Sequence, residues 1–119
     1  EFLKELCSLQ ESYSTIQTSI VKIIRGDVRK TFSNFLKKNK NSFFSLVYFD
    51  LDIYKPTFET LLSLEKHMNK GCVIVLDQFN TNEWPGETKA VKDFFKKTKK
   101  KYQVKQSKFK KQCSYFIYK

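Results

Sequence analysis

The first forty residues hold apolar positions at two different spacings. One set recurs every three or four residues and predicts a helix over residues 1–11. Its members are Phe2, Leu3, Leu6 and Leu9. Residues 20–24 instead form a short, largely β-branched run that ends before Gly26, which predicts a strand. Thr31 precedes an apolar stripe at helical spacing and is predicted to cap a second helix.

Two nearly continuous apolar runs follow, and an aspartate ends each of them. Residues 43–49 run into Asp50, and residues 72–76 run into Asp77. Apolar runs without polar alternation are typical of strands that are buried on both faces of a parallel sheet. We therefore predict two neighbouring strands whose carboxyl ends each carry an acid.

Helices and a closing hairpin are predicted around these two strands. Between the strands, Pro56 is placed to open a helix and Gly71 to end it. The apolar side of this helix comprises Phe58, Leu61, Leu62 and Met68. A further helix is predicted from Glu87, after a loop that contains tryptophan, proline and glycine. Residues 102–105 and 114–118 are predicted to form two strands around a basic turn.

The predicted elements alternate between helices and strands until the final hairpin. Such alternation predicts an α/β fold with a mostly parallel sheet, helices on both faces and a C-terminal antiparallel hairpin. At 119 residues the chain is at most one small domain, and its 40% hydrophobic content suffices for a core. The opening helix has neither a cap nor a start methionine, so residues 1–119 are predicted to be part of a longer domain.

The net charge of +11 has two interpretations that the sequence leaves open. Residues 96–111 contain nine lysines and no acid, which would suit a surface that binds nucleic acid through phosphate contacts. The chain is also rich in Phe, Tyr, Ile and Asn, as expected from a coding bias toward AT-rich codons. The basic segment contains few aromatic residues and no recognition motif. A nucleic-acid partner is therefore not expected as the main function.

Cysteine and histidine usage argues against a zinc site and a disulfide framework. The cysteines, Cys7, Cys72 and Cys113, are scattered and odd in number, and His67 is the only histidine. Reduced thiols and a cytoplasmic location are expected. No stretch is long and apolar enough to span a membrane, and the start does not have the form of a signal peptide.

The two strand-terminal aspartates are the strongest candidates for chemistry. Two parallel strands joined by one helix bring Asp50 and Asp77 to the same carboxyl edge, where open α/β sheets bind ligands. Asp52 follows in the adjacent loop. Because three acids at one edge repel each other, a cation is expected among them, and oxygen ligands favour Mg²⁺. An aspartate in either place could instead cap the following helix.

Four segments resemble macrocin O-methyltransferase-like enzymes, which are class I S-adenosylmethionine (SAM)-dependent methyltransferases. Residues 48–57, Tyr-Phe-Asp-Leu-Asp-Ile-Tyr-Lys-Pro-Thr, resemble the DxDLYxPT segment of that family. Residues 70–77 are similar to its pGGvIvfDD strand, and residues 84–91 to its WPGExxAV helix entry. Residues 26–31 match a kGDxxxT segment. The resemblance spans about residues 20–118 and implies a Rossmann-like methyltransferase domain.

The resemblance also implies roles for individual residues. Asp50 and Asp77 would hold a Mg²⁺ ion, together with Gln78, which stands where many relatives carry a second acid. Asp52 would be the general base for the acceptor hydroxyl, which belongs to a sugar or another small metabolite. Asp27 would lie near the adenine of SAM, and Asp50 would also border the cofactor.

One part of the family's pattern has no counterpart in the sequence. The Gly-rich SAM loop and its strands are absent, and the glycines Gly26, Gly71 and Gly86 stand alone. The chain by itself is therefore expected to bind SAM poorly and to self-associate through strand edges and apolar faces that remain uncovered.

The sequence leaves one further enzyme class as an alternative. A haloacid-dehalogenase-type phosphatase would share the Asp-x-Asp pattern of Asp50 and Asp52, but that family carries Thr or Val where this chain has Tyr54. The motif would also normally open the domain, whereas here two predicted elements precede it. This class is therefore a weaker alternative than the methyltransferase.

Overall fold

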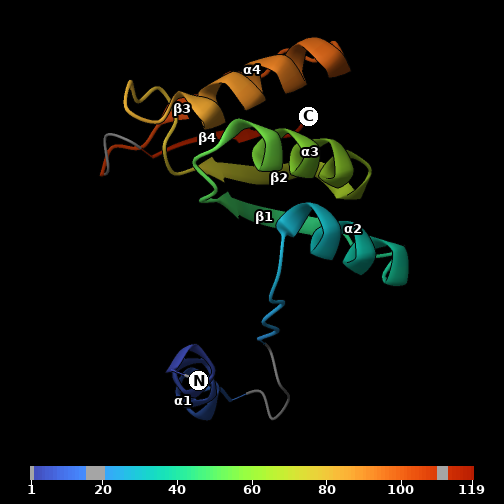
Figure 1. The fold of residues 1–119 in the computed structure, drawn as a ribbon, viewed down its shortest axis with the longest axis vertical. Coiled ribbons are helices and arrows are strands. Elements are labelled where there is room, and N and C mark those ends of the chain that lie inside the picture. Colours follow the sequence, from blue (N-terminus) through green and yellow to red (C-terminus); the bar gives the residue numbers. More distant parts are fainter. Residues whose placement is uncertain (1, 16–20, 110–112) are drawn as a thin grey trace.

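A computed structural model describes residues 2–15, 21–109 and 113–119, which form an α/β fold (Figure 1). Four α-helices, one 3-10 helix and four strands are present in this part of the chain. In order, they are α1 (Phe2–Ser12), α2 (Val28–Lys38), β1 (Phe44–Phe49), α3 (Tyr54–Leu64), the short 3-10 helix η1 (Glu65–His67), β2 (Met68–Leu76), α4 (Pro85–Thr98), β3 (Lys105–Gln106) and β4 (Ser114–Ile117).

The strands form one sheet in the order β1-β2-β4-β3. β1 and β2 are parallel, with Phe49 paired to Leu76, and α3 makes the crossover between them. β4 runs antiparallel to β2 and pairs with β3 as a hairpin. The predicted α/β fold class with a C-terminal antiparallel hairpin is confirmed. Among the described strands, however, only the β1–β2 pair is parallel, and the predicted helices on the second face of the sheet are not found in the described residues.

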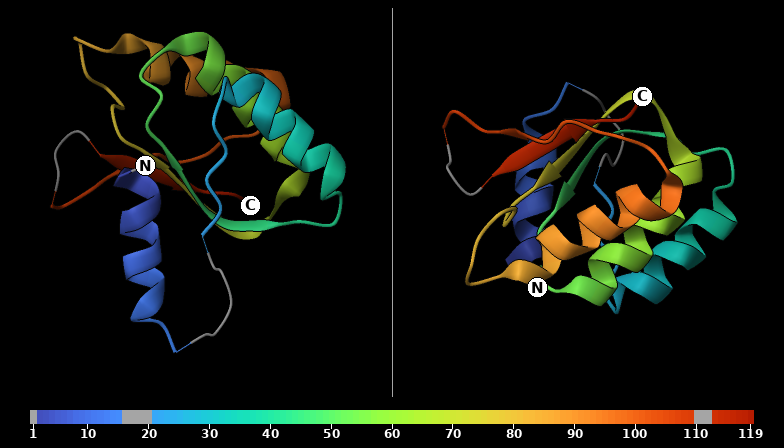
Figure 2. Two further views of the ribbon diagram at one scale, coloured as in Figure 1. Left: turned by 60° about the horizontal axis from the view of Figure 1, so that its bottom comes forward. Right: turned by 90° about the horizontal axis from the view of Figure 1, so that it is seen from above.

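Three helices form a layer against one face of the sheet. α2, α3 and α4 lie side by side in this layer, with α3 between the other two (Figure 2). The core lies between the helices and the sheet, since apolar side chains from both are removed from water there. Its fully buried members are Leu61, Leu64, Ile74, Leu76, Val91, Phe94 and Phe116.

The other face of β1 is largely exposed, contrary to the prediction of a strand buried on both faces. Leu46 is 63% exposed and Tyr48 is 55% exposed. β1 is an edge strand of the sheet. In the described part of the chain, no second layer of helices covers the exposed face of this strand. α1 lies apart, beyond the β1 edge, with none of its residues buried (Figure 1). The apolar run of β1 therefore indicated strand formation correctly but not the coverage of its second face.

Two predictions before β1 are wrong. Residues 21–24 are not a strand, and residue 20 lies outside the described residues. A strand needs a neighbour for its backbone N–H and C=O groups, and no described strand lies beside this segment. The second helix begins at Val28 with Asp27 rather than Thr31 as its N-cap. Asp27 caps because its carboxylate accepts the N–H of Arg29, which an Asp does well at this position.

Several element boundaries also differ from the prediction. α3 starts at Tyr54, and Met68 and Gly71 belong to β2 rather than to the helix and its stop. Gly71 adopts φ +94° inside the strand, and its N–H donates to the Tyr118 carbonyl at 2.8 Å. α4 starts at Pro85, two residues before the predicted start. The first hairpin strand is two residues long because only Lys105 and Gln106 pair with β4.

Candidate active site

The carboxyl ends of β1 and β2 place two acids next to each other. Asp50 and Asp77 directly follow the paired residues Phe49 and Leu76. The Asp77 N–H donates to the Phe49 carbonyl at 3.1 Å, so the ladder continues to the start of the loops. Asp50 is exposed, whereas Asp77 is only 7% exposed. The structure thus brings these two sequence-predicted residues to one edge of the sheet.

Asp77 accepts hydrogen bonds at both carboxylate oxygens. The Tyr48 hydroxyl donates to Oδ1, and the Gln78 side-chain amide donates to Oδ2 at 3.3 Å. The hydrogen bond to Asp77, followed by desolvation, raises the pKa of Tyr48 to about 12, so this hydroxyl stays a proton donor at neutral pH. The sequence did not point to Tyr48, because a tyrosine within an apolar strand run resembles any other strand residue.

Asp52 lies in the tight loop between β1 and α3. Its backbone has φ 56°, in the left-handed region that residues other than glycine rarely adopt. One carboxylate oxygen, Oδ1, is buried and has no hydrogen-bond partner among the described residues. A carboxylate in this condition is suited to accept a proton or to bind a donor from a ligand.

Besides Tyr48, the site contains a second polar residue to which the sequence did not point. Glu87, in the first turn of α4, is fully buried. Its Oε1 accepts the backbone N–H of Gln78 at 3.2 Å, and its Oε2 lacks a partner within the described parts of the chain. Desolvation, together with the charges of Asp52, Asp77 and Asp50, raises the Glu87 pKa to about 7, although the bond from Gln78 lowers it.

The acids of the site do not by themselves form a group of three metal ligands. Across the residues that the structure describes, no three His, Cys, Asp or Glu side chains come together to hold an ion. Gln78 contributes a buried side-chain oxygen, Oε1, that has no partner there. Buried oxygens without partners therefore come from three segments: Asp52 after β1, Gln78 after β2, and Glu87 at the start of α4.

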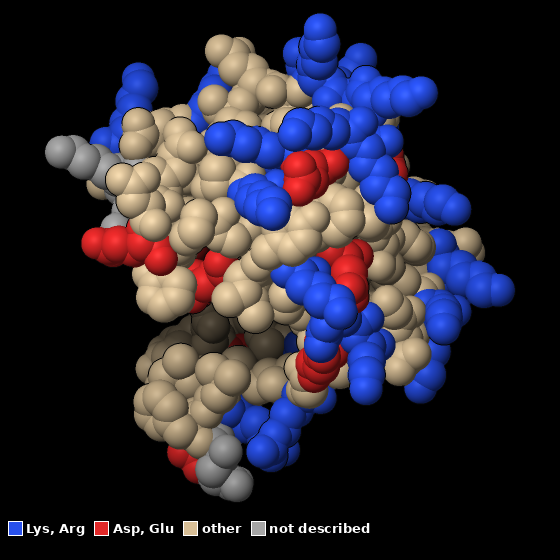
Figure 3. Space-filling view, turned by 45° about the horizontal axis from the view of Figure 1, so that its top comes forward, with Lys and Arg blue, Asp and Glu red and all other residues tan. Residues whose placement is uncertain are grey.

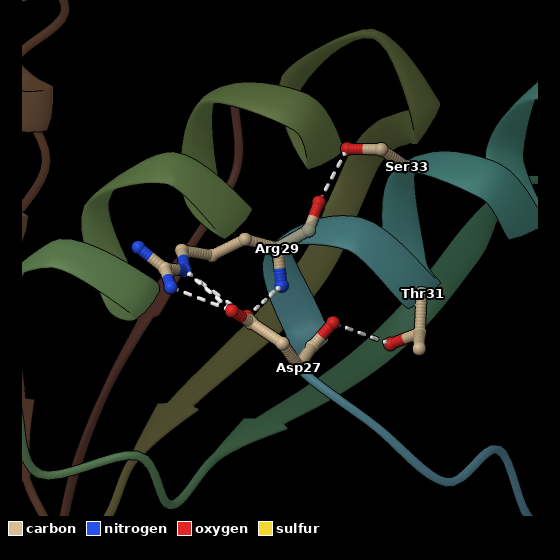
Figure 4. Close-up of polar contacts among 4 residues, drawn as sticks. All are labelled: Asp27, Arg29, Thr31 and Ser33. Carbon is tan, nitrogen blue, oxygen red and sulfur yellow. Dashed lines mark hydrogen bonds and ion pairs between the residues drawn. The ribbon is translucent and has the colours of Figure 1, made fainter.

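Asp27 lies in a different local setting from the other candidates. Its carboxylate receives the backbone N–H of Arg29 at 3.0 Å and forms an ion pair with the Arg29 guanidinium at 2.5 Å (Figure 4). These side-chain and backbone bonds lower the Asp27 pKa to about 2. The carboxylate is thus engaged within its own helix, and its contact with an adenine stays a prediction.

The pKa of Glu87 leads to a prediction about stability. The folded-state value, about 7, lies above the reference value of 4.5, so the protonated form favours folding. This contribution is fully present below pH 4.5 and is lost as the pH rises through 7. The loss should be on the order of 3 kcal/mol in the free energy of unfolding. Urea unfolding between pH 4.5 and 8, compared with Glu87→Gln, measures it, because that variant should lack this part of the pH dependence. An equal pH dependence in both proteins would contradict the shift.

Lysines crowd the outer surface above the helical layer. Lys89, Lys92, Lys96 and Lys97 are exposed on α4, and Figure 3 shows many Lys and Arg side chains (blue) over the upper part of the molecule. Asp93 pairs with Lys96 at 3.7 Å, so part of the charge is compensated locally.

Within the described ranges, no helix has the length and apolar character needed to cross a membrane. The cysteines form no disulfide.

Solved structures show which fold this is. The apo structure of CalS11, a TDP-rhamnose 3'-O-methyltransferase of calicheamicin biosynthesis, matches 98% of the chain with a TM-score of 0.88 and 26% identity. A second CalS11 structure gives a TM-score of 0.81. The chain has a methyltransferase fold. The O-methyltransferase NovP matches 96% of the chain with a TM-score of 0.74, and its 18% identity supports the fold alone.

The chain spans about half the length of these solved relatives. It covers 50% and 46% of the two CalS11 chains and 43% of NovP. Neither a protein-family model nor a curated protein matches the sequence. The comparisons therefore support the predicted fold but do not identify the chemistry of this chain's site.

Proposed function

We propose that the chain supplies the acceptor side and the metal side of a SAM-dependent O-methyltransferase. The observation that carries this proposal is the acidic rim, which we define as Asp50, Asp52, Asp77 and Gln78. These residues lie at or just beyond the carboxyl edge of β1 and β2, in a chain with a methyltransferase fold. That edge is where open α/β sheets bind their ligands.

Within the proposal, Asp52 accepts the proton of the acceptor hydroxyl. Methyl transfer to oxygen needs a deprotonated or nearly deprotonated nucleophile that is aligned with the methyl group. The buried Oδ1 of Asp52 has no competing hydrogen bond among the described residues, which supports this role. The left-handed backbone of Asp52 sets the direction in which its Cα–Cβ bond leaves the loop after β1.

Asp50, Asp77 and Gln78 would hold a Mg²⁺ ion. Their oxygens are of the type that this ion prefers, and the Gln78 Oε1 is buried without a partner in the described structure. Asp77 already accepts two hydrogen bonds, and one of these donors, the Gln78 amide, can present its oxygen instead if the amide turns over. When bound, such an ion lowers the pKa of a coordinated hydroxyl.

The proposed acceptor is a sugar hydroxyl. CalS11 is described as a TDP-rhamnose methyltransferase, and it is the relative with the highest similarity among those given above. These relatives support neither the nucleic-acid-binding function nor the phosphatase function.

Residues 1–119 do not by themselves fit SAM, since they lack a Gly-rich loop and Asp27 is engaged by Arg29. The proposal therefore places most of the SAM site outside this chain segment.

A binding experiment on residues 1–119 tests this division of roles. Titration calorimetry should detect no SAM binding, and sedimentation should show self-association through the exposed β1 face and α1, where Leu6 is 50% exposed. A monodisperse monomer that binds SAM at micromolar affinity would mean that the cofactor site is built within these residues.

A further inference from the structure

Glu87 is an unusual residue for the place that it occupies. An acid in the first turn of a helix normally remains in water, where it still benefits from the helix dipole. Glu87 is instead 0% exposed, although glutamate is rarely fully buried unless it is paired. Removing a carboxyl group from water is costly, and only one of its two oxygens has a described partner. The cost of burying this carboxyl group indicates that it has a specific local role.

Glu87 and its neighbour hold the loop that leaves β2. The Glu87 Oε1 accepts the N–H of Gln78 at 3.2 Å, and the Thr88 hydroxyl oxygen accepts the N–H of Asn80 at 2.7 Å. Two successive residues of α4 thus bind alternate backbone N–H groups of one loop. This loop begins at Asp77 and carries Gln78, so the first turn of α4 fixes one side of the acidic rim.

Gly86 brings the same turn of α4 against the other side of the rim. A Cβ at Gly86 would lie 2.6 Å from the Asp52 carbonyl oxygen and 2.7 Å from the Tyr54 nitrogen. Both are backbone atoms, one in the loop after β1 and the other in the first residue of α3. The start of α4 therefore contacts the loops of both strands, and Glu87 lies next to the residue that makes this contact.

We propose that Glu87 is the positioning residue of the acidic rim: its Oε1 holds the backbone at Gln78, and so fixes the ligand oxygens of Asp77 and Gln78 relative to Asp52. The part of this inference that concerns metal ligands rests on the proposed function. The hydrogen bond between Glu87 and the Gln78 N–H does not depend on it. Glu87 acts through Gln78 and is not itself a catalytic residue. An amide in place of the carboxylate retains an acceptor oxygen, so the role is geometric and survives Glu87→Gln.

Two measurements on the full chain test the proposal. Hydrogen exchange reports whether the Gln78 amide is protected, and Mn²⁺ electron paramagnetic resonance reports how tightly the rim binds a divalent ion. Glu87→Ala should speed exchange at Gln78 by about 10-fold or more and weaken Mn²⁺ binding about 10–100-fold, as loss of a residue that orients ligands does. Glu87→Gln should leave both values within about 2-fold of the parent protein. Asp93→Asn, on the same helix, is the matched control and should change neither.

The outcomes separate this inference from the proposed function. If Glu87→Gln loses protection and Mn²⁺ affinity as Glu87→Ala does, charge rather than position is what matters, and the proposal is overturned. If the parent chain binds no Mn²⁺ yet Glu87→Ala alone exposes the Gln78 amide, the metal role fails while the positioning of the loop stands. If Glu87→Ala does not fold, Glu87→Gln decides: unchanged exchange and affinity support the proposal, and a loss of either overturns it.

Discussion

Replacing Asp52 with Asn is expected to lower the rate of methyl transfer by about 10²–10⁴-fold, the usual effect of losing a general base. The enzyme for this test contains residues 1–119 together with a SAM-binding region. The amide has nearly the same shape as the carboxylate but cannot take the proton of the acceptor hydroxyl. The fold should persist, because Asp52 is a loop residue whose buried Oδ1 makes no described hydrogen bond.

Transfer of a labelled methyl group from SAM to a trial sugar acceptor measures this effect, with TDP-rhamnose, which the name of CalS11 gives as its substrate, as the first choice. The matched control is Asp93→Asn, which removes a carboxylate that accepts from the Tyr54 hydroxyl at 3.2 Å and lies on α4 rather than in the acidic rim. Turnover of the control should stay near that of the parent enzyme. Near-normal turnover in the Asp52 variant would remove this residue from the mechanism.

Gly86→Ala should be the most destabilising small substitution at the site. The new methyl group would lie 2.6–2.9 Å from three backbone atoms of residues 52–54, and backbone cannot move away as a flexible side chain can. Overpacking of this kind costs about 3 kcal/mol, which outweighs the gain of about 1 kcal/mol that Ala brings to a helix. Urea unfolding followed by circular dichroism measures the net loss, expected at about 2 kcal/mol or more.

Gly71→Ala separates the steric effect from backbone strain. Gly71 has φ +94°, but no atom lies within 4 Å of the position that its Cβ would take. This variant should lose about 1–2 kcal/mol, the cost of holding a residue with a side chain in a strained conformation. If Gly86→Ala instead unfolded at the urea concentration of the parent protein, α4 would not approach the Asp52 loop as closely as the structure shows.

The paired acids could be predicted because the rule that places them is local. Two apolar runs joined by one helix form a right-handed parallel unit almost without exception, so Asp50 and Asp77 had to share an edge. The failed prediction for residues 20–24 has the opposite origin. A β-branched run forms a strand only beside a partner, and the sequence of the run does not contain that partner.

Glu87 illustrates what the sequence could not reveal about the site. Its position after Pro85 and Gly86 is typical of an exposed acid in the first turn of a helix. Burial of Glu87 depends on how closely α4 packs against two loops. Gly86 permits this close approach, but a single glycine in the sequence does not indicate it. Asp27 shows the converse, because the bonds that the structure gives its carboxylate all come from Arg29, two residues further along the chain.

Binding of Mn²⁺ to residues 1–119 tests the central claim, a divalent-ion site at the acidic rim, most directly. Electron paramagnetic resonance measures the concentration of unbound Mn²⁺, so binding can be followed even if the chain self-associates. One ion per chain should bind, Mg²⁺ should compete for the same site, and Asp77→Asn should weaken binding at least about 10-fold. Asp93→Asn should bind as the parent chain does. Binding that is equally strong in Asp77→Asn, or no binding at millimolar Mn²⁺, would contradict a metal site at the ends of β1 and β2.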